Sequence, residues 1–456
     1  MPRKPHNRRH DPSSVTRRLT VRIQRLAVRL CSVALIACCW GCAPRAEPAR
    51  NSRQVVLVGL DGAAWRVMDP LLATGELPNI AGLISRGCRG RMKSLLISVS
   101  ARIWTTLASG TRPRVHGIRD FTHQVDGKRR LFTSRDVRVP RVWELASDAG
   151  VRVGVTNWWF TYPSAPLNGF VISDHAIPSR SQRTNQVFSR ENPLSTVQSA
   201  LVYPPELWEE FDGLLTEPAH PASQLWGNSE GARARVIEDI REEDQRVLDL
   251  AMRAAARYSP RFQLVYFKGV DRASHRFWYE YEPSHPNFAN LPPNPKLIVR
   301  YKDIIPDAYR NADRLLGRLI EGLGKDDVVM LLSDHGFEAA GRGPNSGTHG
   351  ISAASIDGIY VMAGGPISTQ TCPTEISIFD VAPTALYLLG VAIPGQMEGK
   401  VPSALFAPDY MAATPVEWSE PIAASAPGEA AIAPEDAAER SRIERLRSLG
   451  YFDDPK

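Results

Sequence analysis

The sequence predicts an α/β fold in which a mostly parallel central sheet is flanked by helices on both faces. Apolar runs with β-branched residues alternate along the chain with longer amphipathic stretches, which is the pattern of parallel strands joined by crossover helices. Three of the apolar runs, which end near residues 60, 267 and 332, each lead into an aspartate. Because sites in open α/β sheets gather at the carboxyl ends of the strands, we expect the functional residues at that edge.

The first expected strand covers residues 54–60, where QVVLVGL is continuously apolar, as in a strand buried on both faces. A helix over 78–86 follows and ends at Gly87, since glycine is common just past the end of a helix. The further expected elements, in chain order, are a strand over 92–97, a helix over 103–108, a helix over 139–147, a strand over 151–156, a helix over 234–257, a strand over 262–267, a helix over 308–323, a strand over 327–332 and a helix over 378–389.

One large domain over residues 51–412 is expected to contain these elements. Residues 175–232 interrupt the alternation and are rich in Pro, Ser and Asn, so we interpret them as an insertion that forms a lid over the site. Residues 413–456 form a flexible tail, rich in Ala, Pro and Glu at first, in which a short helix is expected over 439–449. The cysteines of the body are Cys88 and Cys372, and the sequence leaves open whether they form a disulfide.

The net charge of the 456-residue chain is +6, but it is unevenly distributed. Residues 1–50 hold eleven Lys or Arg and two acidic residues, a net charge of +9, which leaves −3 on the remaining 406 residues. Because the body is slightly acidic, the charge gives no reason to expect a nucleic-acid partner.

A cationic leader explains the positive charge of the chain better than nucleic-acid binding does. Its first 29 residues are rich in arginine, and residues 30–42 are uncharged and mostly apolar. This apolar run of ~13 residues is shorter than the ~20 that a membrane span needs, and it is typical of a secretory signal. LIAC at 35–38 resembles a bacterial lipobox with Cys38 as the acylated residue, and Cys42 is a second candidate. We therefore expect an exported lipoprotein of the periplasm or cell envelope, anchored to the membrane, with a plain signal peptide or an uncleaved anchor as alternatives.

Acidic and histidine side chains form a predicted metal site: Asp61, Asp271, His275, Asp334, His335 and His349. Asp271 and His275 are four residues apart and share one face if their segment is helical. Three carboxylates and three imidazoles form a mixed set that suits zinc, with manganese or iron as alternatives. Each residue taken alone is more often a turn, cap or surface residue, so the prediction depends on three strands bringing acids to one edge.

Ser100 is the candidate nucleophile. A helix that begins after Ser100 would direct its free N–H groups at a bound anion. Coordination to a dication would convert the serine hydroxyl, a poor nucleophile unaided, to an alkoxide near neutral pH. The alternative is that Ser100 serves only as the N-cap of that helix.

Motifs in a fixed order along the chain together resemble the alkaline phosphatase superfamily, especially its type I phosphodiesterase and nucleotide pyrophosphatase branch. The motifs are VVLVGLDG (55–62), SARIWTTLASG followed by HGI (100–118), VDRASHRFW (270–278), LLSDHGF (331–337), GTHG (347–350) and DVAPTALYLLGV (380–391). The resemblance covers nearly all of residues 53–412 and implies an alkaline-phosphatase-like central sheet.

The resemblance also implies how two divalent metal ions are held. One ion would be bound by Asp271, His275 and His349. The other would be bound by Asp61, Asp334, His335 and Ser100. The implied reaction is hydrolysis of a small phosphate ester, such as a nucleotide or a phospholipid head group, through a phosphoseryl intermediate on Ser100.

The chain departs from the family pattern after the HGI motif. Nucleotide pyrophosphatases usually place a phosphate-binding Asn there, whereas this chain has Asp120 followed by Phe121. A carboxylate would not bind a phosphate oxygen, so nucleotide specificity does not follow. Asn157 is a candidate substitute, although a residue in that place more often caps the core. The aromatic cluster over 158–162 could stack on a base or lipid, but core packing is the commoner role.

Two other functions are weighed against phosphate ester hydrolysis. A sulfatase would carry its modified residue at Ser98, but the proline that the sulfatase motif requires two residues later is absent. A catalytically inactive, membrane-tethered binding protein would have lost metal ligands, whereas all seven expected positions are filled.

Overall fold

The computed structural model describes residues 53–96, 98–125, 127–177, 200–215, 229–291, 294–340, 346–350 and 352–425. The expected leader with Cys38 and Cys42, most of the expected lid and the expected tail helix lie outside these residues. Within the described part of the chain, no helix is both long and apolar enough to cross a membrane.

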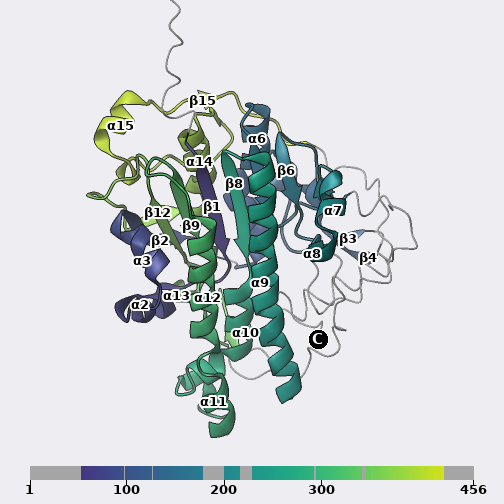
Figure 1. Ribbon diagram of the computed structural model, residues 1–456, viewed down its shortest axis with the longest axis vertical. Helices are drawn as coiled ribbons and strands as arrows, with labels where there is room; N and C mark the ends of the chain where they lie inside the picture. The colour runs from purple at the N-terminus through teal and green to yellow at the C-terminus, as the bar shows by residue number, and fades with distance from the viewer. Residues whose placement is uncertain are drawn as a thin grey trace, which may run out of the picture. The chain divides into compact units, whose positions relative to one another are not determined.

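The core of the fold is a nine-stranded sheet in the order β13-β2-β12-β9-β1-β8-β5-β6-β7 (Figure 1). Five of its eight strand pairs are parallel, which confirms the predicted mostly parallel sheet. The strands are β13 (Glu375–Ser377), β2 (Gly87–Lys93), β12 (Gly358–Ala363), β9 (Val328–Leu332), β1 (Val55–Leu60), β8 (Phe262–Phe267), β5 (Val153–Thr156), β6 (Gly169–Ile172) and β7 (Val202–Tyr203).

Helices cover both faces of the sheet, as predicted (Figure 1). Alternate residues of β1 enter separate core clusters: Val55 and Leu57 face one, and Val56 and Val58 face the other. The first face is covered by α4 (Ser100–Ser109), α6 (Val142–Asp148) and α14 (Val381–Leu389). The second face is covered by α2 (Trp65–Ala73), α3 (Pro78–Ser85), α9 (Glu230–Tyr258), α10 (Gly269–Tyr281) and α12 (Ile304–Leu319).

The largest displacement from the expected elements concerns β2. The strand expected over 92–97 begins at Gly87 instead, the residue expected to stop the preceding helix. Exposed Arg89, Arg91 and Lys93 alternate with less exposed residues along β2, so it does not read as an apolar run. The helix expected over 103–108 begins earlier, at Ser100.

Residues 200–215, within the range expected for the insertion, pack on the second face of the sheet. Residues 200–215 add the edge strand β7 and the short helices α7 (Glu206–Glu210) and α8 (Asp212–Leu215). Leu207, Trp208 and Phe211 from this segment are buried in the core cluster of the second face. α9 then begins at Glu230, within the range expected for the insertion.

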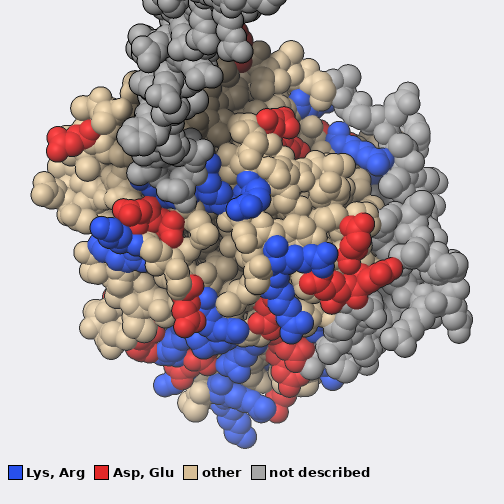
Figure 2. Space-filling model, turned by 45° about the horizontal axis from the view of Figure 1, so that its top comes forward, with Lys and Arg blue, Asp and Glu red and all other residues tan. Residues whose placement is uncertain are grey.

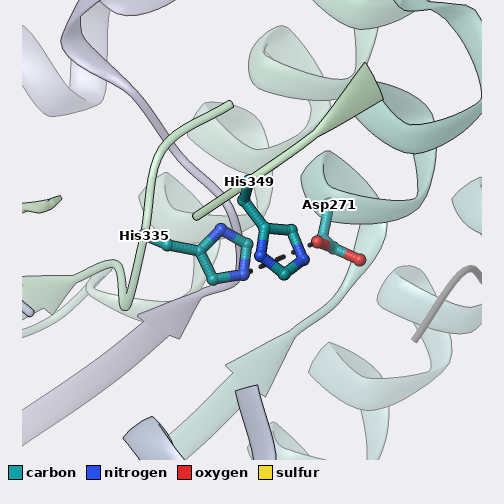
Figure 3. Close-up of side chains that lie close together, drawn as sticks. All are labelled: Asp271, His335 and His349. Atoms are coloured by element: carbon teal, nitrogen blue, oxygen red, sulfur yellow. Dashed lines mark ion pairs between the residues drawn. The ribbon is translucent and has the colours of Figure 1, made fainter. Parts of the chain in front are cut away.

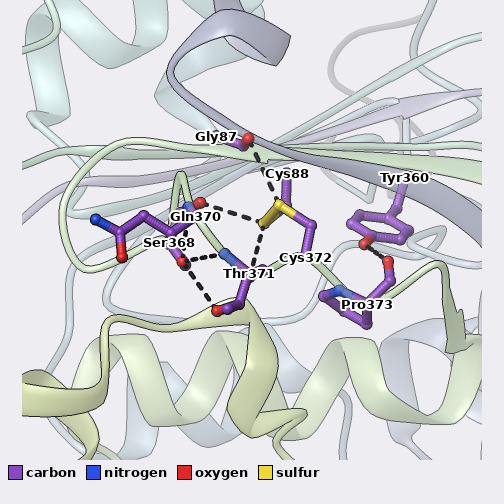
Figure 4. The surroundings of a disulfide bond; sticks show 8 residues. All are labelled: Gly87, Cys88, Tyr360, Ser368, Gln370, Thr371, Cys372 and Pro373. Carbon is purple, nitrogen blue, oxygen red and sulfur yellow. Dashed lines mark hydrogen bonds between the residues drawn. A yellow bond between two sulfur atoms is a disulfide. The ribbon is translucent and has the colours of Figure 1, made fainter.

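Cys88 and Cys372 form a disulfide, which decides the alternative that the sequence left open (Figure 4). Cys88 is buried on β2, and Cys372 lies shortly before β13, the neighbouring strand at the edge of the sheet. The bridge joins residues 284 positions apart, so it fixes the late edge strand to an early part of the chain.

Charged side chains of both signs are interspersed on the visible face of the molecule (Figure 2). The ion pairs of Arg310 with Glu76 and Asp307 are an example on α12. Such exposed pairs contribute little to the stability of the fold, but they place positive and negative side chains next to one another on the surface.

Candidate active site

Three neighbouring strands bring the acidic residues of the site together. Asp61 follows β1, Asp334 and His335 follow β9, and Asp271 lies in the first turn of α10, which follows β8. The order β9-β1-β8 makes these strand ends adjacent, and all of them point the same way because the pairs are parallel. All four side chains are fully buried.

His335 is the centre of one group of candidate ligands. Its Nε2 atom lies 3.4 Å from Asp334 Oδ2 and 3.5 Å from Asp61 Oδ1. Ser100 Oγ lies 3.3 Å from the same nitrogen. The ligand atoms of Asp61, Asp334 and His335 are all within 4.8 Å of one another. The structure thus brings together the four residues that the family pattern assigns to one metal ion.

A second group contains Asp271, His335 and His349, whose ligand atoms are also within 4.8 Å of one another (Figure 3). The rings of His335 and His349 are stacked, with centroids 3.8 Å apart. His335 therefore takes part in both groups. The family pattern places His275 with Asp271 and His349, and His275 lies at the margin of the group, with Nε2 3.5 Å from Asp271 Oδ1.

Backbone carbonyl groups fix the tautomers of two histidines. His335 Nδ1 lies 3.0 Å from the carbonyl oxygen of Gly336, and His275 Nδ1 lies 3.1 Å from that of Gly347. A carbonyl oxygen only accepts, so each Nδ1 carries the hydrogen and each Nε2 presents a lone pair. Both lone pairs are therefore available to a cation among the carboxylates.

The electrostatics of the cluster fit a divalent metal ion. Burial raises the pKa of Asp334 well above its usual range, and Asp61 and Asp271 raise it further. Burial lowers the pKa of His275 to about 4, and it also lowers the pKa of His349, which the neighbouring His335 lowers further. Unprotonated histidine nitrogens thus lie 3.4–3.9 Å from carboxyl oxygens, and a cation bound between them would favour the ionised form of the carboxyl groups.

Three buried atoms of the cluster support this fit. His275 Nε2, Asp334 Oδ2 and His349 Nδ1 accept no hydrogen bond from the described residues. A buried polar atom without a hydrogen bond is costly, and metal coordination is one way to compensate it.

Hydrogen bonds between the loops that follow β1 and β9 hold the ligands in place. The amide of Gly62 donates to Asp334 Oδ1, and the amide of Ala63 donates to Ser333 Oγ at 2.8 Å. The Ser333 hydroxyl in turn donates to the carbonyl oxygen of His335 at 2.9 Å. Ser333 was missed as a functional residue, because a serine before Asp-His gives no signal of its own in a single sequence.

Ser100 is the first residue of α4 rather than its cap. Val99 occupies the N-cap position, and no side chain caps the helix there. Because His335 Nε2 has a lone pair, the Ser100 hydroxyl donates to it. The geometry therefore favours a role in the site over the alternative of a simple helix cap.

Asn157 and the aromatic cluster face the core. The Asn157 side-chain amide donates to the carbonyl oxygen of Tyr266 at 2.9 Å. Trp158, Trp159, Phe160 and Tyr162 are at most 8% exposed. Such burial favours packing over stacking on a base or lipid.

The sequence of the chain matches one protein family over most of its length. Residues 55–373 match the model of the type I phosphodiesterase / nucleotide pyrophosphatase family, which is more than half of the chain. The chain belongs to this family. Membership confirms the resemblance and the predicted enzyme class, a metal-dependent phosphoester hydrolase.

Solved structures similar to this phosphodiesterase-family chain are distant in sequence. Phosphonate monoester hydrolase from Silicibacter pomeroyi is 15% identical, with 78% of this chain and 77% of that chain covered and a TM-score of 0.46. Human ectonucleotide pyrophosphatase/phosphodiesterase 5 is 12% identical, with 75% and 96% covered and a TM-score of 0.43. Phosphonoacetate hydrolase from Sinorhizobium meliloti is 16% identical, with 64% and 58% covered and a TM-score of 0.35, so the chain spans 58% of that length. No curated protein sequence matches the chain.

The HGI motif of this family member contains a buried histidine that links α4 to the next turn. The amide of Ile118 donates to His116 Nδ1 at 3.1 Å, so Nε2 carries the hydrogen and donates to Thr106 Oγ1 at 3.0 Å. Burial lowers the pKa of His116 to about 3, and the nearby positive charge of Arg102 lowers it further. His116 thus helps to hold α4, and with it Ser100, as a neutral residue.

We expect His116 to make the stability of the fold fall in acid. Its pKa is lower in the folded chain than the ordinary value of about 6.5, so the unfolded chain binds the proton more readily. This contribution is fully present above pH 6.5 and is lost as the pH falls from 6.5 towards 3. At pH 5 the loss is about 2 kcal/mol. Urea unfolding at pH 7.5 and pH 5 measures it.

The matched variant is His116→Gln, whose amide can both accept from Ile118 and donate to Thr106. The difference in unfolding free energy between the two pH values should shrink by about 2 kcal/mol in this variant. His123→Gln, on the half-exposed hairpin strand β3 (Thr122–Val125), is the control and should retain the full difference. An unchanged difference in His116→Gln would contradict the assignment.

Proposed function

We propose that the chain hydrolyses phosphate esters at two divalent metal ions, with Ser100 as the nucleophile. The observation that carries the proposal is the convergence of Ser100, three aspartates and three histidines at one buried edge of the sheet. We assign Asp61, Asp334, His335 and Ser100 to one ion. Asp271, His275 and His349 hold the other, and zinc suits this set of nitrogen and oxygen ligands best.

Metal ions at these positions would lower the pKa of the serine hydroxyl and offset the charge of the phosphoryl oxygens. Ser100 Oγ attacks phosphorus and forms the phosphoseryl bond while the bond to the leaving alcohol breaks. Water then attacks phosphorus, the bond to Ser100 Oγ breaks, and Ser100 Oγ takes back a proton from that water. The product is phosphate when the substrate is a monoester and a phosphate monoester when the substrate is a diester. Ser100 is the first residue of α4, and the N-terminus of a helix favours a bound anion such as a phosphoryl group.

The substrate class is a small phosphate ester, such as a nucleotide or a phospholipid head group. Asp120 occupies the region where nucleotide pyrophosphatases place an asparagine, and its carboxylate would repel phosphate. Asn157 makes hydrogen bonds within the core, to Tyr266 and Lys268. These features favour general phosphate ester hydrolysis over a nucleotide-specific reaction.

Replacing Ser100 with alanine tests the nucleophile directly. Ser100→Ala should still bind metal but lose roughly 10³–10⁶-fold in turnover of a nitrophenyl phosphate diester, because the covalent route is gone. Acid quenching during wild-type turnover, followed by peptide mass spectrometry, should find phosphate on Ser100.

Ser98→Ala is the matched control, since Ser98 lies two residues before Ser100 and its hydroxyl makes no hydrogen bond to the described residues. It should retain most of the activity. The reverse ranking, with faster hydrolysis of an aryl sulfate, would identify the chain as a sulfatase. A wild type without turnover of any ester would identify it as a binding protein.

Metal content tests the division of the ligands. The wild type should bind two ions per chain, and His275→Ala should lower the occupancy towards one, because His275 completes the group of Asp271 and His349. Elemental analysis of dialysed protein measures this, with His123→Ala as a control that should keep both ions. Full double occupancy in His275→Ala would refute the assignment.

We further propose that the chain is an exported lipoprotein. The Cys88–Cys372 disulfide supports this, because structural disulfides are typical of oxidising compartments outside the cytosol. The cationic leader and the lipobox-like sequence also support export as a lipoprotein. Mass spectrometry of the membrane fraction should find an N-terminal, acylated Cys38 or Cys42. A cytosolic chain that begins at Met1 and has reduced cysteines would contradict export.

A further inference from the structure

The Asp61 carboxylate contacts different partners through its two oxygens. Asp61 Oδ1 lies 3.5 Å from His335 Nε2, on the side of the candidate metal ligands. Asp61 Oδ2 accepts a hydrogen bond from the hydroxyl of Tyr266. One oxygen is thus directed at the ligand cluster while the other is held by a tyrosine of the neighbouring strand β8.

The direction of this hydrogen bond follows from a second one. The indole nitrogen of Trp159 can only donate, and it donates to the Tyr266 hydroxyl oxygen at 2.6 Å. The proton of Tyr266 is therefore left for Asp61, whose carboxylate can only accept. Because a donated hydrogen bond polarises the hydroxyl, Trp159 makes Tyr266 a stronger donor to Asp61.

We propose that Tyr266 and Trp159 are positioning residues that orient Asp61 for metal binding. The inference rests on the proposed function and adds two residues to it. Groups that hydrogen-bond to a metal ligand commonly fix its orientation and set its affinity for the ion. Tyr266 and Trp159 would act through Asp61 without touching the substrate.

The backbone around Tyr266 is built for this contact. Gly59 of β1 is paired in register with Tyr266, and a Cβ atom at Gly59 would lie 2.7 Å from the Tyr266 ring. Only glycine at this position lets the ring lie against β1 and reach Asp61, two residues further along. Gly59 of the VVLVGLDG motif is therefore needed for the close approach of the Tyr266 ring to β1.

Trp159 lies in a turn that is fixed by hydrogen bonds to Asp174. Asp174 accepts hydrogen bonds from the amides of Phe160, Thr161 and Tyr162, at 3.1–3.3 Å. Asn157 and Phe160 have φ angles of 61° and 57°, a left-handed conformation that asparagine tolerates but that is costly for a bulky residue such as phenylalanine. The turn thereby directs the indole of Trp159 back to Tyr266, and the ammonium group of Lys268 lies 4.3 Å from the centre of its ring system.

The Tyr266 ring also contacts the helix of the nucleophile. Trp104 lies four residues after Ser100 on α4, and its ring meets that of Tyr266 edge to face, with centroids 4.8 Å apart. Tyr266 therefore touches both the strand that ends at Asp61 and the helix that begins at Ser100. A change at its hydroxyl would alter Asp61 while leaving this ring packing in place.

The experiment compares metal affinity in three variants that each remove one buried hydrogen-bond donor. Tyr266→Phe removes the hydroxyl, and Trp159→Phe removes the indole N–H. Tyr387→Phe is the matched control, because Tyr387 is buried on α14 and its hydroxyl donates to the carbonyl oxygen of Thr414 at 2.7 Å. Metal-free protein is titrated with Zn²⁺ in competition with a chromophoric chelator, and thermal unfolding is recorded alongside.

Tyr266→Phe should weaken one of the two zinc sites by about 10–100-fold and leave the other unchanged. Trp159→Phe should weaken the same site by a smaller factor, since Tyr266 remains. Tyr387→Phe should lose a similar amount of thermal stability but bind both ions as the wild type does. In phosphate diester hydrolysis, kcat should fall in the first two variants, in the same order, with KM little changed.

Two outcomes would overturn the inference. If Tyr266→Phe and Trp159→Phe bind both ions as tightly as the wild type, Asp61 needs no positioning, while the proposed function stands on wild-type turnover. If the wild type binds no zinc and hydrolyses no phosphate ester, the inference and the proposed function fail together. Should Tyr266→Phe not fold, Trp159→Phe alone decides, because it keeps the tyrosine that packs against β1.

Discussion

Three carboxylates buried at the ends of adjacent parallel strands are the constraint on which the rest of the site depends. Strands β9, β1 and β8 are neighbours, and strands of one sheet lie about 4.8 Å apart, so Asp334, Asp61 and Asp271 cannot avoid one another. Burying like charges this closely is unfavourable unless protons, cations or hydrogen bonds offset them. The raised pKa of Asp334 expresses that cost. The histidines, the amides of the loops and the hydroxyl of Tyr266 all offset part of it, and divalent ions would offset the remainder.

The long apolar strands could be predicted from sequence, because burial on both faces leaves a continuous signal. β1, β8 and β9 lie within one residue of their expected bounds, and the acids that follow them were found for that reason. β2 could not be placed, because one face of it is exposed and carries charges. β12 was not expected at all, and it pairs antiparallel with both of its neighbours, a choice that no local pattern dictates.

Side-chain partners in the site were less accessible to sequence reasoning than the ligand types. An aspartate after an apolar strand is visible in a sequence, but its hydrogen-bond donor is not. In the sequence, Tyr266 looks like an ordinary core residue of β8, and Trp159 looks like part of an aromatic turn. Only the structure shows that Trp159 donates a hydrogen bond to Tyr266 and that Tyr266 donates one to Asp61. The disulfide of Cys88 and Cys372 was undecided for the same reason, since pairing across 284 residues depends on the order of strands in the sheet.

Buried ion pairs with α9, in addition to apolar contacts, hold α10, the helix that carries Asp271 and His275. Arg272, the residue between them that faces α9, forms buried ion pairs with Asp239 and Glu243. Buried pairs of this kind add little net stability, but removing one partner leaves an uncompensated charge, so they strongly disfavour any rotation that would separate them. Consecutive residues of a helix are about 100° apart, and fixing Arg272 against α9 therefore fixes the direction of Asp271.

Asp244 of α9 adds a second anchor at the start of the same helix. It accepts hydrogen bonds from the amides of Lys268 and Gly269, both at 3.1 Å, where the free N–H groups of α10 favour a carboxylate. A Cβ atom at Gly269 would lie 2.2 Å from Asp244 Oδ2, so the approach requires glycine. With its first turn and its rotation both set by α9, α10 presents Asp271 and His275 to the ligand cluster in one orientation. Tyr266 does the same for Asp61 from the other face of the sheet, so the two halves of the site are positioned by separate layers of the fold.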